Sequence, residues 1–456
     1  MGAAIVGIAS FLFFLFFQAT GIYGGDSGDL VTAAATFGVP HPPGYPLYTL
    51  LGWLLTKLPW FTPAWRVSLL SSVPHALTVA LVYLLVFRLT KARLAGLFAA
   101  VSLAGNYLFF LYSVTPEVFA LFDLFVIALT VLLFQWKQTK NSRYLFGASF
   151  IFGLSLSHHH VILFLVPAMV YWIWLQQYAT KHSLIRLFAY WLIGLLPYLY
   201  LPIAGAGSSI INWNRPDTAD NLLRLVTRAD YGTFVSGGFY GGLLTQRIAQ
   251  VKAYVQFFLM DIGGIGLVLA AFGLFWLRRC RRDMFWFMIL AIVSVGPLFF
   301  FYASFPLVNR FTLGTYERFL LPSYVLTSLL IGIGFWQVIT GIRTVTFVRT
   351  ELRRLLIAGG ALVLFLYPTI FFGMTVWRFW GLRDDRTADR LGRDILASVA
   401  PDSILILGRD TPLFTAQYMR YALALRPDVM VIHASRLATT DYPQVLRRIF
   451  LQLRIP

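Results

Sequence analysis

Two aspartates follow the first apolar run of the chain, in the stretch GGDSGD at residues 24–29. Asp26 and Asp29 are three residues apart, so in a helical turn both carboxylates share one face. A carboxylate beside a membrane is partly removed from water, which raises its affinity for a proton and suits it to act as a general base. The same spacing suits a helix cap, in which Asp26 or Ser27 accepts hydrogen bonds from free backbone N–H groups. Spacing alone leaves both interpretations open.

The segment HPPGYP, residues 41–46, comes shortly after this pair. Its two prolines hold an extended turn, and its glycine supplies flexibility between the rigid neighbours. A long loop made rigid in this way favours a shaped binding site, so we expect His41 and Tyr45 to contact a substrate. The alternative is a re-entry turn that leads into an interfacial helix, PLYTLLGWLLTKL.

Five further polar residues stand at the ends of apolar runs. Glu117 is an acid at a membrane boundary, where an unpaired carboxylate is costly. Arg318 suits a forked contact to a phosphate, and the alternatives are an internal pair with Glu317 or snorkelling at the interface. His158 and His159 belong to a run of three histidines, which cannot all face one metal with good geometry. We therefore expect substrate contacts from these side chains and no metal site.

The elements that must position these residues are apolar and long. Of the 456 residues, 58% are hydrophobic and 12% are charged, whereas a soluble domain carries about 25% charged residues. The chain is therefore predicted to be an all-α polytopic membrane protein. About eleven apolar runs have roughly membrane length, at 3–20, 67–87, 94–112, 117–136, 144–157, 161–177, 187–203, 252–277, 284–302, 319–341 and 355–377. Asp123 and Asp261 lie inside such runs, either as functional groups or as helix-packing partners.

The net charge of +18 comes largely from short Lys and Arg clusters between the apolar runs. Such clusters resist translocation, so they predict topology and an attraction to anionic lipids rather than a nucleic-acid footprint. A cytoplasmic N-terminus places every cluster on the cytoplasmic side and all the polar candidates above on the other side. We expect the first helix to be retained rather than cleaved, because it lacks a basic n-region. The single cysteine, Cys280, excludes an intrachain disulfide.

From Asp384 onward the composition changes. A polar amphipathic helix, the short strand SILIL, the helix PLFTAQYMRYALAL and a second strand DVMVI are predicted in turn. Alternating helices and strands favour parallel pairing. We therefore divide the chain into a transmembrane domain, 1–380, and a small extracytoplasmic α/β unit, 381–456, that leans on it.

The block GGDSGDLVTAAATFGVPHPPGYPLYTLLG resembles the signature of a large family of polytopic membrane proteins whose animal members are endoplasmic-reticulum protein O-mannosyltransferases. The likeness continues in order through TPEVFALF, GLSLSHHH, YLYLPI, INWNRPDTADNLLRLVTRADYGTF, YERFLLPSY and RDTPLFTAQYMRYALALRPDVMVI. The sequence departs from the family pattern at Ser157 and His160, which leaves the role of the histidine loop open.

That resemblance implies the GT-C glycosyltransferase fold, with Asp26 as base, Asp29 as its partner and Glu117 as a second acid. Arg318 then matches the position expected to hold the lipid phosphate. The predicted function is transfer of a sugar from a polyprenyl-phosphate donor to a hydroxyl of a protein, lipid or glycan acceptor, at the extracytoplasmic face of a bacterial inner membrane. No cofactor is expected, although DSGD could ligate a divalent metal through oxygen. The alternatives are a glycolipid transporter or flippase, and a non-catalytic sugar-lipid-binding protein.

Overall fold

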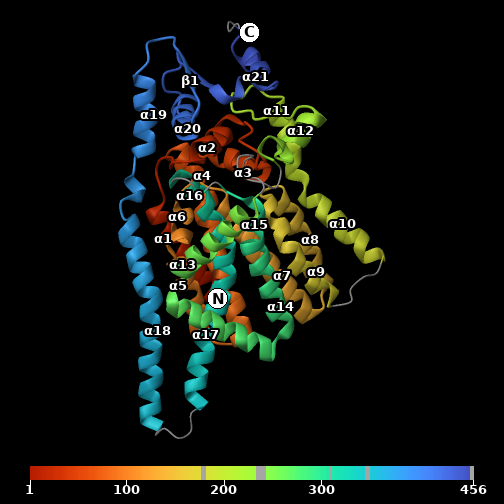
Figure 1. Cartoon of the computed structure of the whole chain (residues 1–456), viewed down its shortest axis with the longest axis vertical. Helices are drawn as coiled ribbons and strands as arrows, with labels where there is room; N and C mark the ends of the chain where they lie inside the picture. Colours follow the sequence, from red (N-terminus) through yellow and green to blue (C-terminus); the bar gives the residue numbers. More distant parts are fainter. Residues whose placement is uncertain (176–180, 233–242, 306, 308–309, 345–349, 452–456) are drawn as a thin grey trace.

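The structure is a computed structural model that describes residues 1–175, 181–232, 243–305, 307, 310–344 and 350–451. It is a bundle of long apolar helices with a small α/β unit at one end (Figure 1). The first helices are α1 (Gly2–Phe17), α2 (Ser27–Thr36), α3 (Pro46–Thr56), α4 (Pro63–Thr90), α5 (Arg93–Ala104), α6 (Tyr107–Val114), α7 (Phe119–Thr139), α8 (Ser142–Leu156) and α9 (Val166–Trp174). They are followed by α10 (Lys181–Gly194), α11 (Tyr200–Gly205), α12 (Ala219–Val226), α13 (Leu244–Cys280), α14 (Arg282–Val293), α15 (Phe299–Ala303), α16 (Arg310–Glu317), α17 (Leu321–Thr344) and α18 (Thr350–Phe379).

Within the described residues, seven helices are long and apolar enough to cross a membrane, or eight if one bent pair counts as a single span. The seven are Pro63–Thr90, Phe119–Thr139, Leu184–Gly205, Leu244–Cys280, Arg282–Ala303, Thr312–Gly341 and Ile357–Ala397. This is fewer than the eleven expected from hydropathy. The predicted run 94–112 is broken by a 71° bend between α5 and α6, where the Asn106 side chain caps α6. The runs 3–20 and 144–157 form helices of 16 and 15 residues, about 24 Å at 1.5 Å per residue, against a hydrocarbon core of about 30 Å.

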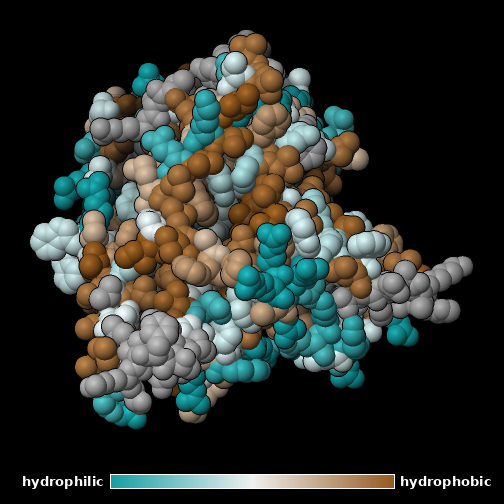
Figure 2. All heavy atoms as spheres, turned by 60° about the horizontal axis from the view of Figure 1, so that its bottom comes forward, coloured by the Kyte–Doolittle hydropathy of each residue, from teal (hydrophilic) through white to brown (hydrophobic). Residues whose placement is uncertain are grey.

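The helices differ in how much of their surface they bury against the protein. Most of the membrane-length windows of α7 and of Thr312–Gly341 are buried, 83% and 89% respectively. In contrast, only 12% of the Ile357–Ala397 window is buried, and α18 stands at the edge of the bundle (Figure 1). Broad hydrophobic areas cover the face seen in Figure 2. An apolar outer surface of this kind fits contact with lipid acyl chains.

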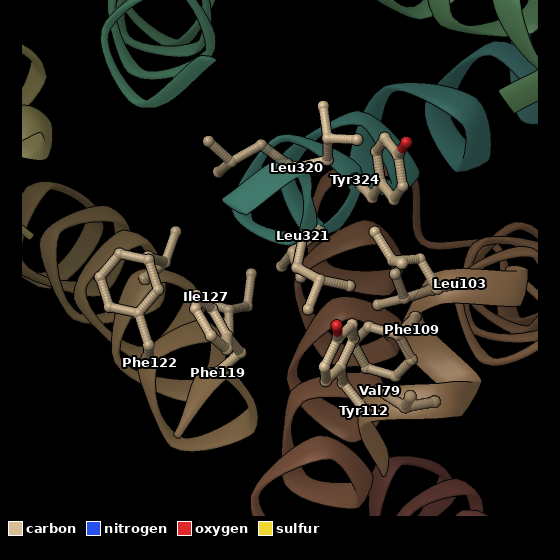
Figure 3. Close-up of a cluster of buried hydrophobic side chains, with 14 of the residues drawn as sticks. Val79, Leu103, Phe109, Tyr112, Phe119, Phe122, Ile127, Leu320, Leu321 and Tyr324 are labelled. Atoms are coloured by element: carbon tan, nitrogen blue, oxygen red, sulfur yellow. The ribbon is translucent and has the colours of Figure 1, made fainter. Parts of the chain in front are cut away.

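The core where α4, α5, α6, α7 and α17 meet lies directly behind the polar candidates. Figure 3 shows side chains of all five helices converging there, with Phe119 and Phe122 of α7 on one side and Leu321 and Tyr324 of α17 on the other. Phe119 follows Glu117 by two residues and Leu320 follows Arg318 by two. Packing of this cluster therefore fixes where the acid and the arginine emerge.

The C-terminal unit has the predicted order of elements. They are α19 (Thr387–Ala397), β1 (Ile404–Leu407), α20 (Asp410–Gln417), β2 (Met430–His433) and α21 (Tyr442–Ile449). The two strands pair in parallel, with Ile404 opposite Met430, which confirms the predicted pairing. The unit sits on α2, where a Cβ added to Gly28 would lie 2.6 Å from the Phe414 carbonyl oxygen. A glycine at this position therefore lets the two backbones approach closely.

Candidate active site

A cavity of about 1030 Å³ opens beneath the C-terminal unit. Asp26, His41, Tyr45, Glu117 and Arg318 line its polar end. The rest of the wall is largely apolar and comes from the bundle helices and their connections, including Leu156, Val161, Leu163, Phe164, Trp191, Leu195, Phe299 and Phe305. One cavity thus joins a cluster of charges to a long apolar wall.

Arg318 is the hub of the polar end. Arg318 is the first residue of a 3-10 turn, Arg318–Leu320, between α16 and α17. One terminal nitrogen lies 2.7 Å from Asp26 Oδ2 and the other 2.9 Å from Glu117 Oε1. The guanidinium also stacks over Phe119 at 5.4 Å, and only 7% of the residue is exposed. The attraction between the charges of an arginine shielded from water in this way is stronger than in an exposed pair, because little water competes for them.

Asp26 and Asp29 share a face of α2, as their spacing predicted. Both face His41, whose Nδ1 lies 2.7 Å from Asp29 Oδ2 and whose Nε2 lies 3.9 Å from Asp26 Oδ2. The backbone N–H of His41 also donates to Asp29 Oδ2, at 2.9 Å. Asp26 occupies the N-cap position of α2 but its side chain makes no cap hydrogen bond. The carboxylate of Asp26 is therefore used by Arg318 and not by the helix end.

The turn that carries His41 and Tyr45 depends on Gly44. This residue has φ +84°, and a Cβ there would lie 3.0 Å from Leu201 and from Leu225. Only glycine adopts such a conformation without strain. The turn leads directly into α3, and His41, Pro42 and Tyr45 line the cavity.

Glu117 is positioned by backbone contacts on both sides of the α6–α7 junction. The Ser71 hydroxyl lies 3.3 Å from both the backbone nitrogen and the carbonyl oxygen of Glu117. His158 Nε2 lies 2.7 Å from the Val118 carbonyl, and burial lowers the pKa of His158 to about 4, so the neutral ring donates to that oxygen. Glu117 is 3% exposed.

The three titratable groups around Arg318 have shifted proton affinities. Burial by itself raises the pKa of Asp26, but the charge of Arg318, aided by His41, outweighs burial and holds this pKa below its usual value. Burial raises the pKa of Glu117 to about 7, against the effect of Arg318 and with a further contribution from Asp26. For His41, burial lowers the pKa, but the charge of Asp26 and the hydrogen bond to Asp29 together raise it. Asp26 is therefore ionised at neutral pH, and its charge favours the protonated form of His41.

Four of the predicted site residues do not line the cavity. Asp29 is fully buried and contacts two residues that line the cavity, His41 and Trp213. His158 and His159 lie behind the cavity wall, where the His159 ring packs against Phe119 at a centroid distance of 5.6 Å. Glu317 is also absent from the lining, although its neighbour Arg318 belongs to it. Within the described part of the chain, no three His, Cys, Asp or Glu side chains come together as a metal site.

Three residues of the site were not singled out from the sequence. Trp213 donates from Nε1 to Asp29 Oδ1 at 3.2 Å. Arg228 lines the cavity, and its Nε is buried without a hydrogen-bond partner among the described residues. Asp410, at the start of α20, lines the cavity from the C-terminal unit. All three stand in sequence blocks that carry the family resemblance, and this was the available signal.

Known proteins with similar sequences are protein O-mannosyltransferases. Residues 26–182 match the family model described as the Protein O-mannosyl-transferase TMEM260 N-terminal domain. The mouse Protein O-mannosyl-transferase TMEM260 is 29% identical over 449 residues, which cover 93% of this chain and 62% of the relative. The corresponding Dictyostelium discoideum protein is 23% identical, with 96% of this chain and 58% of the relative covered. The chain thus spans about three fifths of the length of these curated relatives.

Solved structures show the fold. ArnT from Cupriavidus metallidurans bound to undecaprenyl phosphate superposes with a TM-score of 0.65 at 10% identity, over 98% of this chain and 88% of ArnT. The apo state of the same protein gives a TM-score of 0.60 at 11% identity, over 96% of this chain and 91% of ArnT. The chain is an integral membrane protein with the ArnT-like GT-C fold, and in sequence it is similar along nearly its whole length to the TMEM260 protein O-mannosyltransferases.

Proposed function

We propose that this protein transfers a sugar, mannose by analogy with its relatives, from a polyprenyl-phosphate donor to a hydroxyl group of a protein acceptor. The observation that carries the proposal is the joining of Asp26 and Arg318, 2.7 Å apart, at the polar end of a large and mostly apolar cavity. A glycosyl phosphate needs a positive charge at the departing phosphate and a base at the incoming hydroxyl. Both groups are present there side by side.

In the proposed reaction the acceptor oxygen forms a bond to the anomeric carbon while the bond from that carbon to the phosphate oxygen breaks. The bonding electrons leave with the polyprenyl phosphate, and the hydroxyl proton passes to the Asp26 carboxylate. Asp26 is a weak base while Arg318 holds it. A donor phosphate that binds Arg318 competes with Asp26 for the guanidinium and so raises the proton affinity of Asp26.

The cavity also offers a second cation for the phosphate. Arg318 already contacts two carboxylates, whereas Arg228 lines the same cavity with its Nε unused among the described residues. An arginine presents planar donors that match phosphate oxygens. We therefore assign Arg228 to the donor phosphate together with Arg318, and the apolar wall to the prenyl chain. The ArnT neighbour is itself described as bound to undecaprenyl phosphate, a lipid of this class.

Transfer from a radiolabelled polyprenyl-phosphate mannose to a serine- and threonine-containing peptide tests the proposal in proteoliposomes that hold the full chain. Asp26→Asn preserves the shape of the side chain and removes the base, so transfer should fall about 10²- to 10⁴-fold. Asp220→Asn is the matched control, because Asp220 is exposed and does not line the cavity.

Three outcomes overturn the proposal. Undiminished transfer by Asp26→Asn excludes this base, and an inactive wild type excludes the donor or the acceptor. Movement of a labelled glycolipid across sealed vesicles without any sugar transfer would favour the flippase alternative.

A further inference from the structure

One arginine of the C-terminal unit, Arg436, is buried against the loop that borders the site. The Arg436 guanidinium lies between two aromatic rings, 4.6 Å from the Trp213 centroid and 4.4 Å from that of Tyr442. The same group donates to Asp441 Oδ2 at 2.8 Å and to the Asn212 carbonyl at 2.9 Å. Arg436 is 7% exposed and Asp441 5%. A buried arginine with both a carboxylate and a carbonyl partner is held in one orientation.

Trp213 is fixed by this contact and by its own backbone. The Trp213 N–H donates to the Val39 carbonyl at 3.1 Å, and the Val39 N–H donates to the Ile211 carbonyl at 2.7 Å. Residues 211–213 therefore run beside the segment that leads into His41. The indole has Arg436 on one face, and the His433 ring meets it edge-on at 5.4 Å. Little freedom is left for rotation of the ring.

The indole N–H in turn completes the surroundings of Asp29. Asp29 Oδ1 accepts from Trp213, while Oδ2 faces both the backbone N–H and the ring Nδ1 of His41. The Asp29 carboxylate is completely buried, so these donors define its orientation. The His41 ring is thereby held with Nε2 toward Asp26.

We propose that the C-terminal unit is a positioning element of the active site, acting in the order Arg436, Trp213, Asp29 and His41. None of Arg436, Trp213 and Asp29 needs to touch the reacting atoms for this role. The proposal rests on the transfer reaction proposed above. It explains why a small α/β unit is docked over a membrane cavity: its removal or displacement would leave the His41 ring, which faces Asp26, without a fixed orientation.

Two variants test this chain of contacts in the full-length protein in proteoliposomes. Trp213→Phe keeps an aromatic ring beside Arg436 but removes the indole N–H together with the pyrrole part of the ring, whereas Arg436→Gln removes the cation and its forked hydrogen bonds. Each should lower kcat about tenfold to a hundredfold, as loss of positioning does, with KM for the donor changed by less than about twofold because Arg318 and Arg228, assigned to the donor phosphate, are unchanged. The double variant should be no slower than the slower single variant, because both changes act through one contact.

Arg426→Gln is the matched control. Arg426 also pairs with an aspartate, Asp428, and with backbone carbonyls of the C-terminal unit, but it has no contact with residues 211–213. This variant should leave kcat unchanged. Singles that retain the wild-type kcat, or a double variant whose loss is the product of the two single losses, would overturn the proposal.

A second measurement separates the positioning role from the reaction itself. His41 is partly accessible from the cavity, with 15% of its side chain exposed, so its acylation by diethyl pyrocarbonate can be followed by mass spectrometry of the folded protein. Modification should be faster in Trp213→Phe and Arg436→Gln than in the wild type or Arg426→Gln. Faster modification with an inactive wild type would preserve the positioning role and refute the sugar transfer, and equal rates in all four proteins would refute the positioning role.

Discussion

Two pairs of carboxylates in this protein have very different surroundings. Asp26 and Glu117 share one arginine at the wall of a cavity of about 1030 Å³. Asp123 and Asp261 lie within the long helices α7 and α13. Asp123 Oδ2 is 3.2 Å from His75, and Asp261 Oδ2 is 2.5 Å from the Tyr324 hydroxyl.

The difference in available space separates the two groups more clearly than burial does. The cavity beside Asp261 and Tyr324 measures about 10 Å³, the smallest volume that can hold one water molecule. Asp123 is as buried as Asp29, at 0% exposed, yet it does not line the large cavity. An acid in this helical bundle thus becomes a candidate for chemistry when it lies beside both a cation and a substrate-sized space. Otherwise it joins helices together.

The largest effect predicted by this comparison is on stability, in Arg318→Gln. Removal of the arginine leaves the carboxylates of Asp26 and Glu117 without their shared cation, and loss of one partner of a buried ion pair costs about 3–5 kcal/mol. The midpoint of thermal unfolding in detergent should fall accordingly.

Arg383→Gln is the control for that variant. Arg383 also stacks on a phenylalanine, Phe16, at 5.6 Å and donates to its carbonyl, but it is exposed, so we expect a change within about 0.5 kcal/mol. Equal losses of stability in the two variants would show that the ion pairs of Arg318 with Asp26 and Glu117 contribute no more than an exposed contact.

The next effect is on the pH dependence of stability. Because burial raises the pKa of Glu117 to about 7, the folded protein keeps a proton that the unfolded chain releases near pH 4.5. The folded state therefore loses stability as the pH rises from about 4.5 to 7, by at most about 1.4 kcal/mol per pH unit. Glu117→Gln keeps an acceptor for Arg318 and should abolish this part of the slope.

Unfolding midpoints of the wild type and Glu117→Gln, measured from pH 4.5 to 7.5, check this prediction. The two proteins should differ least near pH 4.5, where both side chains are neutral, and the variant should be relatively more stable at pH 7. Parallel curves over the whole range would show that Glu117 does not titrate in this window.

The sequence predicts contacts between residues that are near each other in the chain better than contacts between distant ones. The spacing of Asp26 and Asp29 correctly placed both on one face, because i and i+3 positions are neighbours in any helix. The partners of Arg318 lie 292 and 201 residues away, and local pattern carries no information on such pairs. The run of histidines was interpreted as substrate contacts from its polarity, but packing turned His158 and His159 behind the cavity wall.

The fold likewise has local features that the sequence predicts and long-range features that it does not. Short apolar runs separated by turn residues predicted the parallel pair β1–β2, because alternation of helix and strand constrains the topology of a small unit. Hydropathy overestimated the number of full-length spans, because it registers an apolar run but neither the bend at Asn106 nor the short helices that the runs 3–20 and 144–157 form. The docking of the C-terminal unit on α2 depends on Gly28 and Phe414, which are far apart in sequence.

A smaller effect is predicted on donor binding, in Arg228→Gln. Loss of a charge-assisted hydrogen bond to the phosphate costs about 1.5–3 kcal/mol, so KM for the polyprenyl-phosphate sugar should rise more than about tenfold. Steady-state kinetics with the donor varied at saturating acceptor measure it.

Arg224→Gln serves as the matched control for that measurement. Arg224 lies one helical turn earlier and pairs with Asp230, but it does not line the cavity. An unchanged KM in Arg228→Gln, or an equal rise in both variants, would remove Arg228 from the donor site.

The smallest effect should come from the helical core, in Tyr324→Phe. This change removes the hydroxyl that faces Asp261, and side-chain hydrogen bonds between membrane helices contribute about 0.6 kcal/mol on average. The unfolding midpoint should therefore shift only slightly, and the rate of sugar transfer per folded molecule should stay at the wild-type value, because the small space beside Tyr324 is separate from the large cavity. A loss of transfer of tenfold or more without unfolding would mean that the core acid takes part in the chemistry. The distinction between an acid with a cation and a cavity and an acid without them would then fail.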